Sequence, residues 1–172
     1  YCKVPDNSDM QALYSRYISD SGISDMDLYG KLDYIRNILA ENAEYSLTPG
    51  KTPSSEDFVS YFLNENHKGY CVHFATSGVV LARMAGIPAR YAEGYVLLSD
   101  DFSDENKRAD GSYKVDIKDN RAHAWAEIYI DGLGWIPYEF TPSSAAAFNS
   151  EGQTAETQQA TTEAVTTAVL TE

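Results

Sequence analysis

The segment from Cys71 to Ala85 constrains the fold more than any other part of the chain. Apolar or small residues lie on every side of this segment when it is drawn as a helix, and Gly86 and Pro88 follow it directly. A helix that is apolar all round is a buried helix, and glycine followed by proline is a typical stop signal. The sequence therefore predicts a buried central helix that ends near Gly86.

Helical patterns precede this central segment. Apolar residues at i, i+4, i+7 and i+11 predict a helix that begins near Ser24 or Asp25 and ends before the Pro49–Gly50 pair. The run Ser54–Asp57 resembles a capped start, which predicts a second, shorter helix. The inward faces of the two helices are formed by Leu28, Leu32, Ile35 and Leu39, and by Phe58, Phe62 and Leu63.

Strand patterns follow the central segment. After Pro88 the apolar period shifts towards two, with many aromatic and β-branched residues. Four strands are predicted, over Arg90–Leu98, Ser112–Ile117, Ala122–Ile130 and Gly134–Phe140. Helices followed by an antiparallel sheet indicate an α+β domain.

Length and charge restrict the function further. A chain of 172 residues fits one domain, and its 26 acidic against 13 basic residues, a net charge of -13, disfavour a nucleic-acid partner. We predict one domain over residues 1–142 and a low-complexity linker or tail over residues 143–172, which holds seven Thr, seven Ala and four Glu but no Lys or Arg. No apolar run reaches the roughly 20 residues of a membrane span. Because the chain starts at Tyr1 rather than Met, we interpret it as an excised or processed piece.

Cys71 is the candidate nucleophile. It falls in the first turn of the predicted central helix, where free N–H groups and the helix dipole favour a thiolate. The alternative is a small buried core residue, and position alone leaves the two interpretations about even. The only other cysteine is Cys2, at the terminus, and two cysteines are too few for a disulfide scaffold.

Among the three histidines, His123 is the candidate partner of Cys71. His73 lies two residues along the same helix and so points about 200° away from Cys71. His67 lies in a polar run and is expected to be a solvated loop residue. His123 opens an alternating strand, where it shares a face with Trp125 and an acid. A lone strand histidine is usually structural, but this face is a plausible wall of a site.

The next strand returns Glu139 to the neighbourhood of His123. If the paired positions of this hairpin add up to an even number near 264, Glu139 is a diagonal neighbour of His123 on the same face. An odd sum puts the two on opposite faces, and Glu139 is then an ordinary exposed carboxylate. Asp116 or Asp119 would be alternative partners. A zinc site is disfavoured, because the cysteines and histidines show no CxxC or HExxH spacing.

Four blocks of the sequence, taken in order, resemble the transglutaminase-like superfamily. They are KGYCVHFAT at 68–76, AGIPARYAEGY at 85–95, AHAWAEIY at 122–129 and GWIPYEFTP at 134–142. The resemblance spans about Asp25 to Pro142 and implies a papain-like α+β core. Carried over by position, it implies a catalytic triad of Cys71, His123 and Glu139. The family's usual third residue is Asp, so Glu139 keeps the charge but changes the reach.

The resemblance also implies a chemistry, acyl transfer through a thioester, without a cofactor. Superfamily members include proteases, amidases, cross-linking enzymes and inactive binding domains. Our leading hypothesis is a cysteine hydrolase that acts on peptides, proteins or cell-wall peptides. The alternatives are a protein-glutamine transglutaminase with an amine acceptor and a non-catalytic binding module. Bacterial members are often extracytoplasmic or membrane-anchored, and the low-complexity tail fits that location.

Aromatic residues near the Cys–His pair are the candidate substrate-binding residues. We expect Trp125 and Tyr70 to contact substrate. Tyr91 and Tyr95 could do the same, although core packing is the stronger expectation for both. The acidic loop from Asp100 to Asp110 could edge the site and select cationic substrates, but a solvated insertion is the simpler interpretation.

Overall fold

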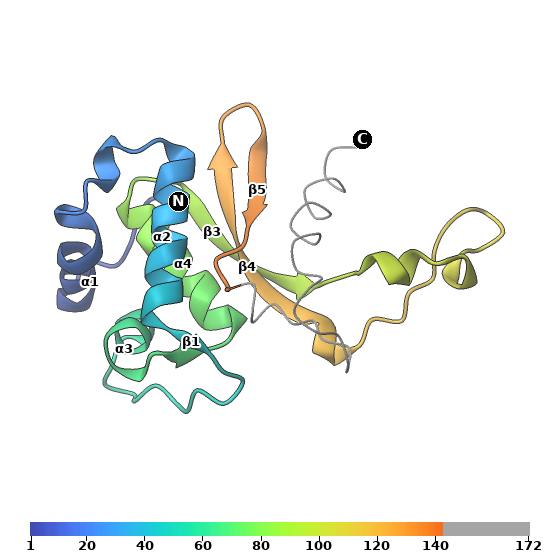
Figure 1. Cartoon of the computed structure of the whole chain (residues 1–172), viewed down its shortest axis with the longest axis horizontal. Helices are drawn as coiled ribbons and strands as arrows, with labels where there is room; N and C mark the ends of the chain where they lie inside the picture. The colour runs from blue at the N-terminus through green and yellow to red at the C-terminus, as the bar shows by residue number, and fades with distance from the viewer. Residues whose placement is uncertain (143–172) are drawn as a thin grey trace. The chain divides into compact units, whose positions relative to one another are not determined.

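The computed structural model describes residues 1–142, so the predicted tail at 143–172 lies outside the described residues. These residues form four α-helices, a pair of two-residue strands and, after the last helix, a three-stranded sheet (Figure 1). In chain order these are α1 (Ser8–Tyr14), α2 (Leu28–Asn42), β1 (Glu44–Tyr45), α3 (Phe58–Tyr61), β2 (Lys68–Gly69), α4 (Cys71–Met84), β3 (Ala89–Tyr95), β4 (Ala122–Ile130) and β5 (Gly134–Tyr138). The predicted α+β class is confirmed.

Helix α4 is the central element of the fold. It contacts α2 as well as β3 and β4, so it lies between a helical layer and the sheet (Figure 1). Its buried residues include Phe74 and Leu81, both fully inaccessible to solvent. The facing side of β4 is formed by Ala124, Ala126 and Ile128, which are also buried. The apolar pattern therefore predicted this helix and its neighbour strand correctly.

The starts of two helices differ from the prediction. Helix α2 begins at Leu28 because the carboxylate of Asp27 accepts a hydrogen bond from the N–H of Gly30 at 2.8 Å. The residues Ile23–Asp25 form a separate 3₁₀ turn. Helix α3 is capped by Asp57, which accepts from the N–H groups of two residues in the first turn, and not by Ser54. In both cases an aspartate closer to the helix satisfies the free N–H groups.

The predicted strand at Ser112–Ile117 is wrong. The whole segment between β3 and β4 leaves the sheet and forms short 3₁₀ turns, with one isolated bridge between Lys107 and Tyr113 (Figure 1). Alternating residues form a strand only where one face is buried, and every residue from Ser112 to Ile117 except Val115 is exposed. Helix α1, which is capped by the side chain of Asn7, was not predicted from the sequence.

The register of the β4–β5 hairpin sets the position of Glu139. The two strands pair Ala126 with Tyr138 and Ile130 with Gly134, so each pair adds up to 264, and the register is the even one of the two that the sequence left open. Glu139 follows the last paired residue of β5. The next residue, Phe140, is fully buried against Gly78 of α4, where a methyl group would lie 2.1 Å from the phenyl ring. Only glycine at this point of α4 lets the chain after β5 come so close.

Candidate active site

Cys71 lies in the first turn of α4, as predicted, and is its first residue. Tyr70, directly before it, is the N-cap residue. The Cys71 side chain is half-buried rather than part of the core. Hydrogen bonding with the side chain of His123 and the backbone of Ala124 lowers the pKa of its thiol. The start of β4 therefore lies directly against the start of α4, and the thiol has polar partners that a core cysteine would lack.

His123 joins Cys71 to Glu139. Its ring nitrogen Nε2 donates to Oε2 of Glu139 at 2.6 Å, and the His123 side chain is only 8% exposed. The other carboxylate oxygen of Glu139 accepts from the N–H of Thr141 at 2.8 Å, which fixes the orientation of this 40% exposed side chain. Asp116 does not take this place, because its carboxylate is 89% exposed and lies 4.0 Å from Lys114. Glu139 therefore lies within hydrogen-bond distance of His123, as the even register implies.

The electrostatics of the three side chains favour an ion pair. Burial raises the pKa of the Cys71 thiol, but hydrogen bonds from His123 and Ala124 together with the charge of His123 lower it below its ordinary value. Burial lowers the pKa of His123, while hydrogen bonds to Cys71 and Glu139 and their negative charges raise it to about 9. A lowered cysteine pKa beside a raised histidine pKa favours a thiolate next to an imidazolium over the neutral pair.

His73 lies near Cys71 in sequence but in a separate pocket. It is 6% exposed, and its ring lies between 4.7 and 5.2 Å, centroid to centroid, from those of Phe58, Phe62 and Tyr70. Its Nδ1 accepts from the backbone N–H of Tyr70 at 3.3 Å. Burial lowers the pKa of His73. The helical phase thus predicted correctly that His73 points away from Cys71.

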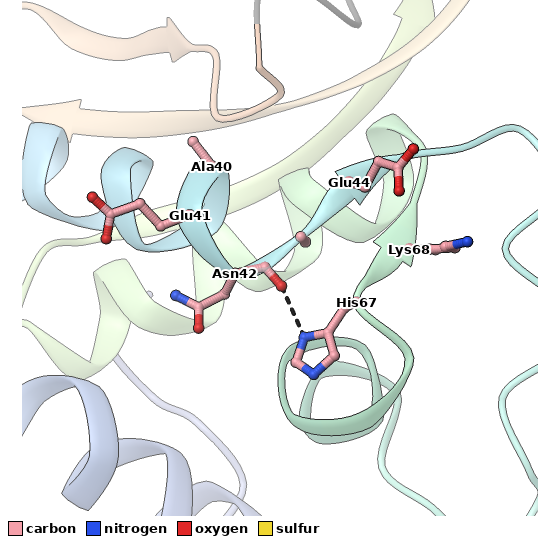
Figure 2. Close-up of a pocket in the computed structure, with 7 residues that line it drawn as sticks. Ala40, Glu41, Asn42, Glu44, His67 and Lys68 are labelled. Carbon is pink, nitrogen blue, oxygen red and sulfur yellow. Dashed lines mark hydrogen bonds between the residues drawn. The ribbon is translucent and has the colours of Figure 1, made fainter.

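The interpretation of His67 as a solvated loop residue is wrong. This residue is half-buried, adopts a left-handed conformation with φ of 55°, and donates from Nδ1 to the carbonyl of Asn42 at 2.8 Å. Figure 2 shows the ring turned towards the end of α2. His67 also lines a cavity of about 460 Å³ together with residues 40–44 and Lys68. His67 satisfies the last carbonyl of α2. The polar residues around His67 in the sequence gave no sign of this distant contact. The cavity does not include Cys71 or His123.

The predicted substrate-binding residues lie beside the Cys71–His123 pair. Trp125 is half-buried, and its ring lies nearly parallel to that of His123 at 6.3 Å. Its indole N–H is buried without a hydrogen-bond partner among the described residues. Tyr70 is half-buried next to Cys71. Tyr91 and Tyr95 are 36% and 55% exposed, so the expected core packing of both is wrong. Binding of substrate by Trp125 and Tyr70 stays a prediction.

Tyr45 is a neighbour of the site that the sequence did not reveal. Burial raises the pKa of its phenol, and the negative charges of Cys71 and Glu139 raise it further. The Tyr45 ring stacks on Phe74 of α4 at 6.3 Å. Tyr45 comes from β1, a strand of two residues, which pairs with β2 just before α4. So short a strand leaves no periodic signal, and only the pairing of Tyr45 with Gly69 brings it to the site.

Residues 1–142 contain neither a cluster of metal ligands nor a membrane-spanning helix. No group of three or more His, Cys, Asp or Glu side chains in this part of the chain is arranged to hold a metal ion. Within the same residues, no helix is both long and apolar enough to cross a bilayer.

Comparison with known proteins identifies the family. The model of the transglutaminase-like superfamily matches residues 19–140, which include Cys71, His123 and Glu139. The chain is 35% identical over 117 residues to the protein YebA of Bacillus subtilis, covering 67% of this chain and 15% of YebA. It is 32% identical over 97 residues to a protein-glutamine gamma-glutamyltransferase of Pseudomonas aeruginosa, covering 56% of this chain and 13% of the relative.

Solved structures agree in fold. Two crystal structures of the periplasmic domain of TgpA from Pseudomonas aeruginosa, one bound to ethylmercury, superpose with TM-scores of 0.57 and 0.58. They are 25% and 24% identical in sequence, and each match covers 81% of this chain and 45% or 46% of the TgpA domain. The chain thus spans about a seventh of the curated relatives that it matches and under half of the solved domain. The chain belongs to the transglutaminase-like superfamily.

Proposed function

We propose that this domain is a cysteine-dependent acyl-transfer enzyme that hydrolyses peptide or amide bonds. Cys71 is its nucleophile, His123 its general acid and base, and Glu139 the carboxylate that orients His123. The observation that carries the proposal is that the His123 imidazole is hydrogen-bonded to a fixed carboxylate, while its interaction with the thiol at the start of α4 raises its pKa and lowers that of Cys71. A nucleophile, a base and a group that orients the base are the minimum for this chemistry.

The first half of the reaction follows from the ion pair. The Cys71 thiolate attacks the carbonyl carbon of the substrate, and the carbonyl oxygen takes the negative charge of the tetrahedral intermediate. The intermediate collapses as the carbon–nitrogen bond breaks, and the imidazolium of His123 gives its proton to the departing amine. The products are a thioester on Cys71 and a free amine, or ammonia where the substrate is a carboxamide. Glu139 stabilises the positive ring before this transfer.

The second half regenerates the enzyme. His123, now neutral, takes a proton from water as the water oxygen attacks the thioester carbonyl. The carbon–sulfur bond breaks, the carboxylic acid leaves, and the thiolate–imidazolium pair is restored. An amine in place of water would give a new amide. This amine-transfer reaction is the second candidate, because a relative that is 32% identical over 97 residues is named a protein-glutamine gamma-glutamyltransferase.

The proposed substrates are peptides or proteins outside the cytoplasm, including cell-wall peptides. The similar TgpA domain is periplasmic, which supports an extracytoplasmic location for this domain. The net charge of -13 supports a protein or peptide substrate rather than a nucleic acid.

Alkylation of the two thiols tests the proposal without knowledge of the substrate. The 172-residue chain is treated with iodoacetamide between pH 5 and 9, and mass spectrometry reads Cys71 and Cys2 separately. Cys71 should react faster than Cys2 below pH 7, because its lowered pKa leaves more thiolate. If Cys2 reacts faster there, Cys71 is not an activated nucleophile and the domain is a non-catalytic module.

Turnover then separates the two candidate reactions. Carbobenzoxy-glutaminyl-glycine and a set of peptide amides are incubated with the chain, with and without monodansylcadaverine, and Cys71→Ala is the control. Release of ammonia or free amine in water, absent in the control, supports hydrolysis. Fluorescent product that exceeds hydrolysis at millimolar amine supports the transglutaminase candidate instead.

A further inference from the structure

Three side chains of β3 lie on the face of the sheet that α4 covers. Tyr91, Glu93 and Tyr95 alternate along the strand, and their partners across the β3–β4 pair are Ala126, Ala124 and Ala122. Cross-strand partners point to the same face of a sheet. Ala124 and Ala126 are buried beneath α4, yet the three β3 side chains opposite this row are exposed. We name Tyr91, Glu93 and Tyr95 the β3 patch.

The β3 patch lies at the start of α4, where Cys71 is. Glu93 pairs with Ala124, and the backbone of Ala124 is hydrogen-bonded to the Cys71 sulfur. Tyr91 is close enough to Cys71 and Tyr70 to be affected by their negative charges, which help burial and Glu93 to raise the pKa of the Tyr91 phenol to about 12. β3 packs against α4, and both the strand register and the charge interaction with Tyr91 put the patch on the side of Cys71.

Glu93 has no cationic side chain as an ion-pair partner among residues 1–142. Its Oε2 accepts a hydrogen bond from the Tyr91 hydroxyl at 3.1 Å, and no Lys, Arg or His within residues 1–142 forms an ion pair with it. The neighbouring Arg90 lies on the other face of the sheet, where it pairs with Glu127. The hydrogen bond orients the Glu93 carboxylate and leaves its negative charge uncompensated at the surface.

Carboxylates and aromatic rings together are the groups that bind organic cations. A carboxylate forms a charge-assisted hydrogen bond with an ammonium or guanidinium group, and a tyrosine ring attracts the same cation over its face. The β3 patch places one exposed carboxylate between two exposed tyrosines on one strand. A neutral or acidic substrate gains nothing from this arrangement.

We propose that the β3 patch is a specificity element that selects substrates with a cationic side chain, an ammonium or a guanidinium, near the carbonyl that Cys71 attacks. The inference rests on the proposed function of Cys71, and it assigns the selection to Glu93 rather than to the acidic loop at 100–110. Tyr91 is a positioning residue that orients the Glu93 carboxylate.

Charged thiol reagents measure this selectivity without a natural substrate. The thiolate attacks a methanethiosulfonate, forms a mixed disulfide and releases methanesulfinate, so reagents that differ only in the charged arm report the local field. The trimethylammonium-ethyl and sulfonato-ethyl reagents are compared on the full chain, and peptide mapping gives separate rates for Cys71 and Cys2. We expect the cationic-to-anionic rate ratio to be higher at Cys71 than at Cys2.

Glu93→Gln should lower that ratio at Cys71 about twofold to threefold, the size of an exposed ion pair, and leave the ratio at Cys2 unchanged. Glu105→Gln is the matched control, because it removes the same charge from an exposed position of the acidic loop. An unchanged ratio in Glu93→Gln overturns the inference. An equal fall in Glu105→Gln overturns it too, because the acidic loop or the overall charge would then be the cause.

A neutral reagent keeps the two proposals separate. If methyl methanethiosulfonate modifies Cys71 more slowly than Cys2 below pH 7, the assignment of Cys71 as the nucleophile is wrong. Fast modification without a charge preference contradicts only the β3 patch. With turnover established, peptide pairs that carry lysine or norleucine beside the attacked residue extend the test. Glu93→Gln should then raise KM for the lysine peptide alone and leave kcat near the wild-type value.

Discussion

His73 and His123 show how two environments next to one cysteine give the same side chain opposite properties. His73 lies in the first turn of α4 among three aromatic rings, with a single backbone N–H as its partner. His123 lies at the start of β4 and has both a thiol and a carboxylate as partners. Burial lowers the pKa of both imidazoles, but only His123 has negative groups that overcome it.

The difference shows that proximity in sequence is a poor guide to chemistry on a helix. His73 is two residues from Cys71, and its ring serves the packing between α3 and α4. His123 is 52 residues away and reaches the thiol because β4 crosses the start of α4. The His73 pocket is therefore the reference against which changes at His123 and around Glu139 can be compared.

Replacement of the two histidines should give the largest contrast. His123→Ala removes the group that stabilises the thiolate and gives the proton to the leaving amine, so turnover should fall by about 10² to 10⁴. His73→Asn keeps an acceptor for the Tyr70 N–H and should leave turnover near the wild-type value, with a lower melting temperature. Steady-state hydrolysis and thermal unfolding measure the two effects. Loss of turnover in a folded His73→Asn protein would reverse the assignment.

The carboxylate should have the next largest effect. Glu139→Gln keeps a side chain that can bond to His123 but removes the charge that stabilises imidazolium, so turnover should fall by about tenfold or more while the fold is kept. Glu139→Asp keeps the charge and loses reach, and its effect should be smaller. The iodoacetamide rate of Cys71 at pH 6 provides a second readout. Equal rates in Glu139→Gln and wild type would mean that Glu139 is only structural.

Two glycines test how each histidine is held in place. A methyl group on Gly78 would lie 2.1 Å from the Phe140 ring, next to Glu139, and one on Gly69 would lie 2.5 Å from Cβ of His73. Both Gly78→Ala and Gly69→Ala should cost about 1 to 3 kcal/mol of unfolding free energy, as overpacked cores do. Only Gly78→Ala should also slow alkylation of Cys71, because it displaces the chain that carries Glu139. Urea unfolding and iodoacetamide rates separate the two results.

Much of this site was predictable because it depends on local periodicity. The all-round apolar pattern of residues 71–85 gave the helix that starts at Cys71, and strand alternation gave the faces of β4. The short loop after β4 indicated that Glu139 returns near His123, but the sequence did not decide on which face of the sheet. The observed register, with paired positions that add up to 264, places Glu139 within reach of His123. Helix phase alone separated His73 from Cys71.

The parts that could not be predicted depend on tertiary contacts with weak local signals. Tyr45 reaches the site through a strand of two residues. Ser112–Ile117 has a strand-like composition but no sheet to join. His67 looked polar and solvated, yet it bonds to the end of α2 from 25 residues away. Tyr91 and Tyr95 were expected in the core, but both side chains are exposed although their partners Ala126 and Ala122 lie on the face of the sheet that α4 covers.

The smallest perturbation is a change of pH alone, which should separate the two histidines without any substitution. His123 should carry its proton at pH 7.5 and lose it as the pH rises through about 9, because the Cys71 sulfur and Glu139 stabilise the charged ring. His73 should be neutral at pH 7.5, because burial lowers its pKa from the ordinary value. NMR titration of the imidazole C–H signals measures both steps.

Turnover should follow the His123 step and not the His73 step. It should rise with pH as the Cys71 thiolate forms, at a pKa below the ordinary thiol value, and fall as His123 loses its proton near pH 9. In Glu139→Gln the alkaline fall should move to lower pH, since one of the groups that raises the His123 pKa is gone, whereas His73→Asn should leave it in place. The two limbs belong to the coupled thiol–imidazole pair rather than to either residue alone. An alkaline limb that moves with His73 and stays fixed in Glu139→Gln would therefore place the working imidazole on α4 instead of β4.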